Sequence, residues 1–525
     1  MAHTDQPHFM DVFKSPFFKV VLPSLAIFLL LRVVFWLSTF PNPDEAYYWL
    51  WGQHPDFSYY DHPPFQAWVE GLFTVVFGKS FFTLRLPNLI SNAVFFYVYY
   101  RISTYLYGKD GINSFWLSVV LILASPLYFL FLALAWHDHW LITFSLIAAY
   151  QFVRFLDSYT VDGLGETKRL YGAGVAIAFA FLCKYNAIFV AAGLVATVIF
   201  HQQWRPLLRD RRLYLAGAIA LCGFIPIVLW NVNNDFQSFQ YYVNRSVDDQ
   251  GFRLKIGETL GFIGLSILTI SPVNAWAMVQ VIKRPRSNFS MQHPSSYHTV
   301  AIWIFAISTL ALMAVSLVST ALYYWNINAY ILLFQLLPSV FIKKRQPEMD
   351  PACAFQDSQI STHQLRKPLF YSGQFYGLLF AALLVIHYSV IPLSAFGSPD
   401  GDPDSRMLYG WDQVGAAVEA QRAAMGDRAF LVTTDYRSAS ALAYQLNDPD
   451  VLAISDRIDQ FDFWYDPNAL KGKNAILLSD DWHPIQPKLL AQFEQTSSPI
   501  TVPVRRFGIW IKNYYIIQGK GFKGE

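Results

Sequence analysis

The sequence has little charge and almost no cysteine. Of its 525 residues 14% are charged and 54% are hydrophobic, whereas a soluble domain carries about 25% charged residues. The net charge of +2 provides no basic surface for a nucleic-acid partner. Cys183, Cys222 and Cys353 have no spacing typical of a disulfide framework or a zinc site. The scarcity of charge therefore predicts a membrane protein.

Long hydrophobic runs are abundant instead, and about 20 apolar residues suffice to cross a bilayer as a helix. We expect about eleven spanning segments, at roughly 17–40, 81–107, 112–135, 138–157, 170–184, 186–201, 213–230, 257–282, 300–320, 325–342 and 369–393. Only helices satisfy their own backbone in lipid, so these runs should be helical. The first run has no small-residue cleavage site before Pro41, which favours a retained helix over a signal peptide.

Basic residues predict the orientation of the chain, because cytoplasmic loops are rich in Lys and Arg. They occupy alternate loops: Lys109, Lys168, Arg169, Arg205, Arg209, Arg211, Arg212, Lys283, Arg284, Arg286, Lys343, Lys344 and Arg345. An odd helix count then places everything after about Ser394 on the opposite, outer side. The polar clusters at 44–45, 61–62 and 137–139, Lys184 and the 231–255 loop also face outward.

The composition changes near residue 396, where a turn-rich linker at 398–404 follows the last apolar run. Beyond it we expect helices at 411–425 and 438–446 and strands at 429–434, 474–479 and 508–517. This order predicts a transmembrane domain over 1–395 and a small α/β domain over 396–525. The latter has neither a Gly-rich phosphate loop nor a nucleophile triad.

Asp44 and Glu45 stand just after the first apolar run, in Pro41-Asn-Pro-Asp-Glu-Ala-Tyr-Tyr-Trp49. Carboxylates at the end of a membrane helix are expensive to bury and usually serve a function. The same residues also suit a helix start, with Pro43 in its first turn. Both interpretations can hold together, because a helix N-terminus stabilises the ionised form of Asp44.

Two further motifs place acids beside histidines. Asp61 and His62 lie in Ser58-Tyr-Tyr-Asp-His-Pro-Pro64, which suits a divalent metal or a plain interfacial loop with tyrosines. Asp138 lies in Trp136-His-Asp-His-Trp140, a break between two apolar runs. We expect Asp138 to join the outward cavity, while His137 and His139 suit either metal ligands or an ordinary turn.

Three other positions suit a phosphorylated sugar. Lys184, between two apolar runs, could hold a phosphate as a point charge or extend to the lipid headgroups. Arg245 could grip a phosphate or be a solvated loop charge. Tyr324 belongs to Tyr323-Tyr-Trp325, whose rings suit a sugar face but also a membrane aromatic belt.

In this order the motifs resemble the GT-C membrane glycosyltransferases. The likeness is to the lipid-A aminoarabinose transferases and the bacterial enzymes grouped with protein O-mannosyltransferases (families 39 and 83), and it covers roughly residues 17–345. It rests on Pro43-Asp44-Glu45 with Tyr47 and Tyr48, Tyr60-Asp61-His62-Pro63, Arg85, Asp138 and Leu182-Cys-Lys-Tyr185.

The resemblance implies a polytopic GT-C fold and inverting transfer of a sugar from a polyprenyl-phosphate donor to a lipid or glycan acceptor of the envelope. It implies a monomer in the bacterial inner membrane, among membrane lipids, with the site and the C-terminal domain facing the periplasm. Asp44 and Asp138 match the catalytic acids. The substrate-binding residues would be Glu45, Tyr47, Tyr48, Tyr60, Asp61, His62, Arg85, Lys184, Arg245 and Tyr324.

The sequence departs from the resembled enzymes at His62, where they have a lysine, and the 231–255 loop has no histidine to complete their metal site. A divalent metal at Asp61 and His62 is therefore one of two alternatives, the other being a plain interfacial loop.

Three other functions compete with this hypothesis. A protein O-glycosyltransferase would share the fold. A lipid-linked sugar transporter or flippase would show an internal repeat and broken or charged helix midpoints, whereas the polar clusters here gather at one end of the helices. A binding scaffold would depend on the outer domain alone.

Overall fold

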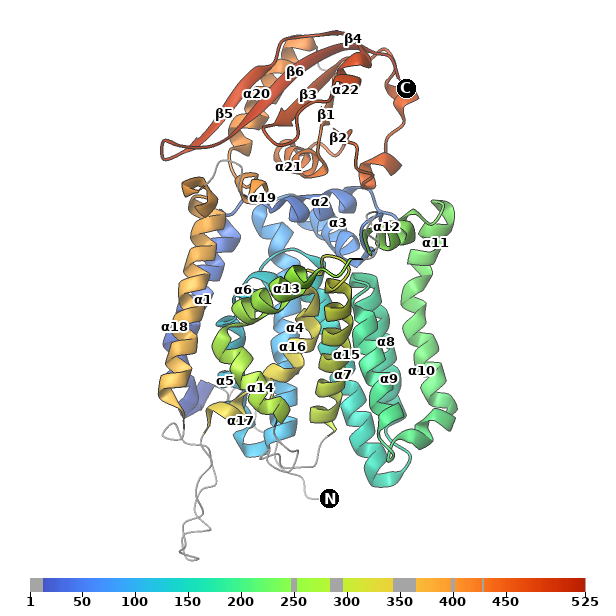
Figure 1. Cartoon of the computed structure of the whole chain (residues 1–525), viewed down its shortest axis with the longest axis vertical. Helices are drawn as coiled ribbons and strands as arrows, with labels where there is room; N and C mark the ends of the chain where they lie inside the picture. Colours follow the sequence, from blue (N-terminus) through green and yellow to red (C-terminus); the bar gives the residue numbers. More distant parts are fainter. Residues whose placement is uncertain are drawn as a thin grey trace, which may run out of the picture. The chain divides into compact units, whose positions relative to one another are not determined.

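The computed structural model describes residues 13–246, 253–283, 296–342, 365–397, 402–426 and 429–524, and this part is mostly helical with one C-terminal sheet (Figure 1). The chain divides into two compact units. The helical unit comprises Met1–Arg32, Asn88–Ala133 and His137–Ala382, and the sheet unit comprises Val33–Pro87, Leu134–Trp136 and Leu383–Glu525. The division into domains at residue 395 stays a prediction.

Seven helices follow the predicted apolar runs within a few residues. They are α1 (Pro16–Ser38), α4 (Phe81–Tyr107), α7 (His137–Asp162), α8 (Thr167–Cys183), α9 (Ala187–Phe200), α15 (Tyr297–Ser316) and α18 (Lys367–Val385). Helices α1, α4 and α18 contribute residues to both units. A π-helical turn at Ile386–Val390 continues α18.

Four other predicted runs are broken, and each continuation has a proline at its first or second position. The pieces are α5 (Gly111–Leu123) and α6 (Pro126–Phe131); α10 (Arg211–Leu221) and α11 (Ile225–Asn233); α13 (Ile256–Ile270) and α14 (Pro272–Lys283); and α16 (Ile327–Phe334) and α17 (Pro338–Phe341). Proline has no N–H for the preceding turn and ends or kinks a helix there. The α13–α14 pair is bent by 102°.

Among the described residues, five helices are long and apolar enough to cross a membrane, or six if the bent α13–α14 pair is one span. The expected count of about eleven is therefore not confirmed. Helices α8 and α9 have 17 and 14 residues, fewer than the about 20 that a span requires. Short 3₁₀ turns join several helices: Gly108–Asp110, Arg205–Arg209, Cys222–Phe224, Tyr323–Asn326 and Leu393–Phe396.

Among the described residues before 395, three helices lie outside the predicted spans. Helix α12 (Gln237–Ser246) belongs to the helical unit, and α2 (Pro43–Gln53) and α3 (Phe65–Phe77) belong to the sheet unit. Helices α2 and α3 pack against each other at two glycines, since a Cβ added to Gly52 would lie 2.5 Å from the backbone nitrogen of Gly71. This close crossing fixes α2, which carries the first acidic motif.

The C-terminal part of the sheet unit is an α/β sheet (Figure 1). Its strands are β1 (Phe430–Thr433), β2 (Leu452–Ala453), β3 (Ala475–Asp480), β4 (Phe493–Thr496), β5 (Ile500–Arg506) and β6 (Ile509–Phe522). Their order is β2-β1-β3-β6-β4, with β5 also paired to β6. Strand β1 is parallel to β2 and β3, whereas β6 is antiparallel to its three neighbours.

The helices of this part include α20 (Trp411–Met425) and α21 (Tyr436–Leu446), and both predicted helices are confirmed. The three predicted strands correspond to β1, β3 and β6, whereas β2, β4 and β5 were not predicted. Shorter elements are α19 (Pro403–Arg406), α22 (Pro487–Ala491), η10 (Gln460–Phe463) and η11 (Pro467–Leu470).

Alternate residues of β3 enter two different cores. Ile476 and Leu478 pack in the larger core with α20, α21 and α2, whereas Ala475 and Leu477 pack in the smaller core with α22. This is the period of two expected of a strand covered on both faces. Because Trp49 and Trp51 of α2 share the larger core, the first acidic motif is fixed against the C-terminal sheet part.

Candidate active site

The first acidic motif is the first turn of α2. Asn42 caps the helix, its Oδ1 accepting from the backbone nitrogen of Asp44 at 3.0 Å, and Pro43 occupies the first helical position. In return Glu45 Oε2 accepts from the backbone nitrogen of Asn42 at 2.9 Å, which completes a capping box. The helix start considered from the sequence is therefore confirmed, with Asn42 as the cap.

Glu45 and Arg85 form a fully buried ion pair, and their exposed fractions are 0% and 2%. Arg85 Nη2 lies 2.8 Å from Glu45 Oε2, and its Nε donates to Oε1 at 3.1 Å. Glu45 Oε1 also accepts from the backbone nitrogen of Ala135 at 2.8 Å. Arg85 Nη1 donates to the carbonyls of Trp36 and Thr39 at the end of α1. These contacts join four segments of the sheet unit, so this geometry supports a structural role for the pair.

Asp44 has a different environment on the same helical turn. It is partly exposed and lies among charges of both signs. The pKa of Asp44 is raised to about 6, first by burial and then by the charges of Asp404 and Asp61, against the opposing charges of Arg437 and Arg457. A carboxylate with this pKa can exchange a proton close to neutral pH, as a general base must.

Tyrosines connect this acid cluster to α21 and to the η10 turn. The ring of Tyr47 lies 4.8 Å from that of Tyr436 and stacks on Phe461 at 5.9 Å. The hydroxyl of Tyr47 accepts from the backbone nitrogen of Gln460 at 2.9 Å, and Gln460 Oε1 accepts from the backbone nitrogen of Tyr60 at 2.7 Å. The predicted site residues Tyr47 and Tyr60 are thus held by the same C-terminal turn.

Asp61 is buried, and its Oδ2 lies 3.9 Å from Arg457 Nη2. Its neighbour His62 contacts the ring of Tyr48 at 6.0 Å. Across the described ranges, no three His, Cys, Asp or Glu side chains converge as a metal ion would require. The metal at Asp61 and His62 stays a prediction.

The helical unit contains Asp138, the acid of the third motif. Asp138 lies in the first turn of α7, and Lys184 follows the last residue of α8. Lys184 Nζ is 3.0 Å from both carboxylate oxygens of Asp138, and both side chains are buried. The same Nζ lies 5.1 Å from the ring centre of Tyr324, a cation–π distance. Three predicted site residues are therefore in direct contact here.

Other predicted residues have less informative positions. His139 Nδ1 lies 2.7 Å from Ser91 Oγ, and Arg245 belongs to α12, with its side chain outside the described part. The assignments of all these residues to catalysis or binding stay predictions. Sequence analysis missed Arg437, Arg457 and Asp404, because nothing in their local sequence connects them to a motif near the N-terminus.

The fold is similar to that of a solved protein, ArnT. ArnT from Cupriavidus metallidurans, solved bound to undecaprenyl phosphate, superposes with a TM-score of 0.61 and 17% identity, covering 95% of this chain and 98% of that one. Its apo state gives the same TM-score at 15% identity, covering 96% and 98%. The family model for dolichyl-phosphate-mannose-protein mannosyltransferases matches residues 61–230.

Together these matches show a GT-C fold like that of ArnT, with a segment at residues 61–230 that resembles the mannosyltransferase family. In sequence the chain is similar to the lipid A galacturonosyltransferase RgtD of Rhizobium johnstonii, with 23% identity over 293 residues. That match covers 55% of this chain and 58% of the relative, so the chain spans less than two thirds of the curated protein that it matches.

Proposed function

We propose that the protein transfers a sugar from a polyprenyl-phosphate carrier to a lipid A or core-oligosaccharide acceptor. The name of RgtD supports a lipid A acceptor, and the undecaprenyl phosphate bound to ArnT supports a polyprenyl-phosphate donor. The observation that carries the proposal is the position of Asp44, which lies partly exposed on the first turn of α2 and whose pKa burial raises to about 6.

In the proposed reaction the bond between the anomeric carbon and the carrier phosphate breaks, and the phosphate leaves with the electron pair. The acceptor oxygen forms a new bond to that carbon from the opposite face, which inverts its configuration. If the acceptor is a hydroxyl, its proton passes to Asp44 as general base. If the acceptor is a phosphate, no proton moves, and Asp44 stabilises positive charge on the sugar ring.

In this proposal the protein is a monomer in the bacterial inner membrane. Residues 1–395 form the transmembrane domain, with about eleven spanning helices, and residues 396–525 form a periplasmic domain. The acids at 44, 61 and 138 face the periplasm in this arrangement. A divalent metal remains an optional part of the proposal.

The decisive experiment is mass spectrometry of lipid A and surface glycans from a deletion strain, complemented with wild-type protein or with Asp44→Asn. The sugar should disappear on deletion and should return with wild type but not with Asp44→Asn. Transfer by the Asp44→Asn protein should fall by about 10²–10⁴-fold. The control is Asp412→Asn, an exposed acid in the first turn of α20, which should restore the product fully.

Full transfer by Asp44→Asn would refute the role of Asp44. A second candidate, protein O-glycosylation, is favoured by the description of the matched family model. It predicts that deletion leaves lipid A unchanged and removes the sugar from envelope proteins, so glycoproteomics of the same strains separates the two candidates.

A further inference from the structure

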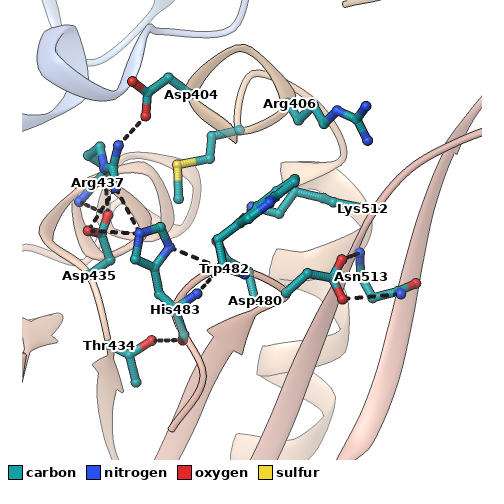
Figure 2. A network of polar contacts seen from close by, with 12 residues as sticks. Asp404, Arg406, Thr434, Asp435, Arg437, Asp480, Trp482, His483, Lys512 and Asn513 are labelled. Atoms are coloured by element: carbon teal, nitrogen blue, oxygen red, sulfur yellow. Dashed lines mark hydrogen bonds and ion pairs between the residues drawn. The ribbon is translucent and has the colours of Figure 1, made fainter. Parts of the chain in front are cut away.

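A continuous polar network extends from the centre of the C-terminal sheet to the first turn of α21 (Figure 2). Its inner end is the ion pair of Lys512 in β6 and Asp480 in β3, with 2.7 Å between Nζ and Oδ2. Both side chains have no exposed surface. The ring of Trp482 covers the pair, 4.7 Å from Lys512 Nζ. A buried ion pair of this kind is held in a single geometry, because either partner alone would be an uncompensated charge.

His483 continues the network outward. Asp480 Oδ1 accepts from the backbone nitrogen of His483 at 2.7 Å and lies 3.0 Å from its Nδ1. The other ring nitrogen, Nε2, lies 2.9 Å from Arg437 Nη2. Since the guanidinium can only donate, Nε2 accepts, and the ring proton is on Nδ1, facing Asp480. Because the imidazole bonds both Asp480 and Arg437, the fixed position of Asp480 also limits the position of Arg437.

The outer end of the network is the guanidinium of Arg437. Its Nε and Nη2 donate to the two carboxylate oxygens of Asp435 at 2.8 and 3.1 Å, and Nη1 pairs with Asp404. Asp435 is itself fixed as the N-cap of α21, where it accepts from the backbone nitrogen of Arg437 at 3.0 Å. With donors engaged on three sides, the guanidinium has little freedom to rotate away.

The helix that carries this guanidinium packs against the helix that carries the candidate catalytic acid. Helix α21 packs on α2, and the ring of Tyr436 contacts that of Tyr47, one helical turn from Asp44. The charged groups that act on Asp44 are Asp61 and Arg457 from two loops, Asp404 from α19, and Arg437 from α21. Tyr436 is the titratable neighbour on α21.

We propose that Arg437 is a positioning residue for Asp44, held in place by the Lys512–Asp480–His483 chain, so that the C-terminal sheet controls the charge of the catalytic acid. This inference depends on the proposed function in one respect only, namely that Asp44 takes part in catalysis. Without the guanidinium, the negative charges of Asp404 and Asp61 would act on Asp44 with less opposition and would favour its protonated form. The sheet would then be a working part of the active site.

The test measures protonation of Asp44 directly. The purified full-length protein is treated with a water-soluble carbodiimide and an amine over a series of pH values, and modification at Asp44 is quantified by tandem mass spectrometry. Carbodiimide requires the protonated acid, so labelling falls as pH rises through the pKa. Wild type should give a midpoint at about pH 6. The Arg437→Gln midpoint should lie higher by about one pH unit.

Two variants control for charge and for general damage. Arg437→Lys keeps the charge and should label with a midpoint close to that of wild type. Arg422→Gln removes an arginine of the same unit, which pairs with Asp448, and should leave the midpoint unchanged. His483→Gln should raise the midpoint by less than Arg437→Gln, since it loosens the guanidinium without removing it.

An unchanged midpoint in folded Arg437→Gln protein would overturn the proposal. If Arg437→Gln does not fold, His483→Gln decides: a higher midpoint supports the proposal and an unchanged one overturns it. No sugar donor is present in this assay. A wild-type protein that fails to transfer sugar would therefore refute the proposed function while leaving the labelling result, and the link between Arg437 and Asp44, intact.

Discussion

The surroundings of Glu45 and of Asp44 differ sharply, although the two acids are adjacent on the first turn of α2. Four donors satisfy the oxygens of Glu45, and its side chain is inaccessible to solvent. Asp44 is partly exposed and balanced between two arginines and two acids. A saturated buried acid fixes chain segments to one another. An incompletely compensated, partly exposed acid on the same turn can respond to pH and to a substrate.

The largest effect should follow from breaking the Glu45 side of this comparison. Arg85→Met leaves Glu45 buried without its cation, which should lower the free energy of unfolding by about 3–5 kcal/mol. Thermal unfolding of the detergent-solubilised protein would measure the loss. The matched control is Arg101→Met in the same helix, which removes a contact with Tyr97 at the surface and should cost about 0.5 kcal/mol or less. Equal destabilisation by both variants would contradict the structural role of Arg85.

On the Asp44 side the expected effect is on rate. The pKa of Asp44 is raised to about 6, so the base is available above that pH and is lost as pH falls. The rate of sugar transfer should therefore decline below pH 6 by about tenfold for each pH unit. Initial rates in proteoliposomes between pH 4.5 and 8 would measure this limb. The residual activity of Asp44→Asn should not decline in this way below pH 6. If the decline persists in Asp44→Asn, it is caused by the titration of another group.

Local features of the chain could be predicted from sequence. Helices α1, α4 and α7 agree with the apolar runs because hydropathy and length are properties of a single segment. The acid at Asp44 and the helix start at Pro43 were recognised for the same reason. Bends such as that between α13 and α14 were not, because a continuous apolar run conceals a break at Pro272.

Contacts between distant segments could not be predicted in this way. Asp138 and Lys184 were each selected as site residues, but nothing in their sequence spacing predicts that they pair. Likewise the helices that carry Arg437 and Asp44 come together only because α2 and α21 share one hydrophobic core. Such pairing depends on the burial of Trp49, Trp51 and Tyr444 together, which is a property of the folded chain rather than of any local motif.

The smallest effect is expected at a third acid, Glu70 of α3. It distinguishes the effect of burying an acid from the effect of burying its charge. Glu70 is fully buried, and its Oε1 accepts from Gln66 Nε2 at 2.7 Å. Burial, and then the charge of Glu45, hold the pKa of Glu70 well above its usual range, which favours the neutral form. Glu70→Gln keeps size and neutrality and should change the free energy of unfolding by less than about 1 kcal/mol.

The pH dependence of stability gives the sharper test of Glu70. The folded protein retains a proton that the unfolded chain releases above about pH 4.3, so this residue makes wild type less stable as pH rises from there. Glu70→Gln has no proton to release, and its thermal midpoint should fall less over the same range. If instead Glu70→Gln destabilises as strongly as Arg85→Met, Glu70 is ionised in the folded protein. Glu45 and Glu70 would then both be charged buried acids, instead of one acid paired with an arginine and one neutral acid.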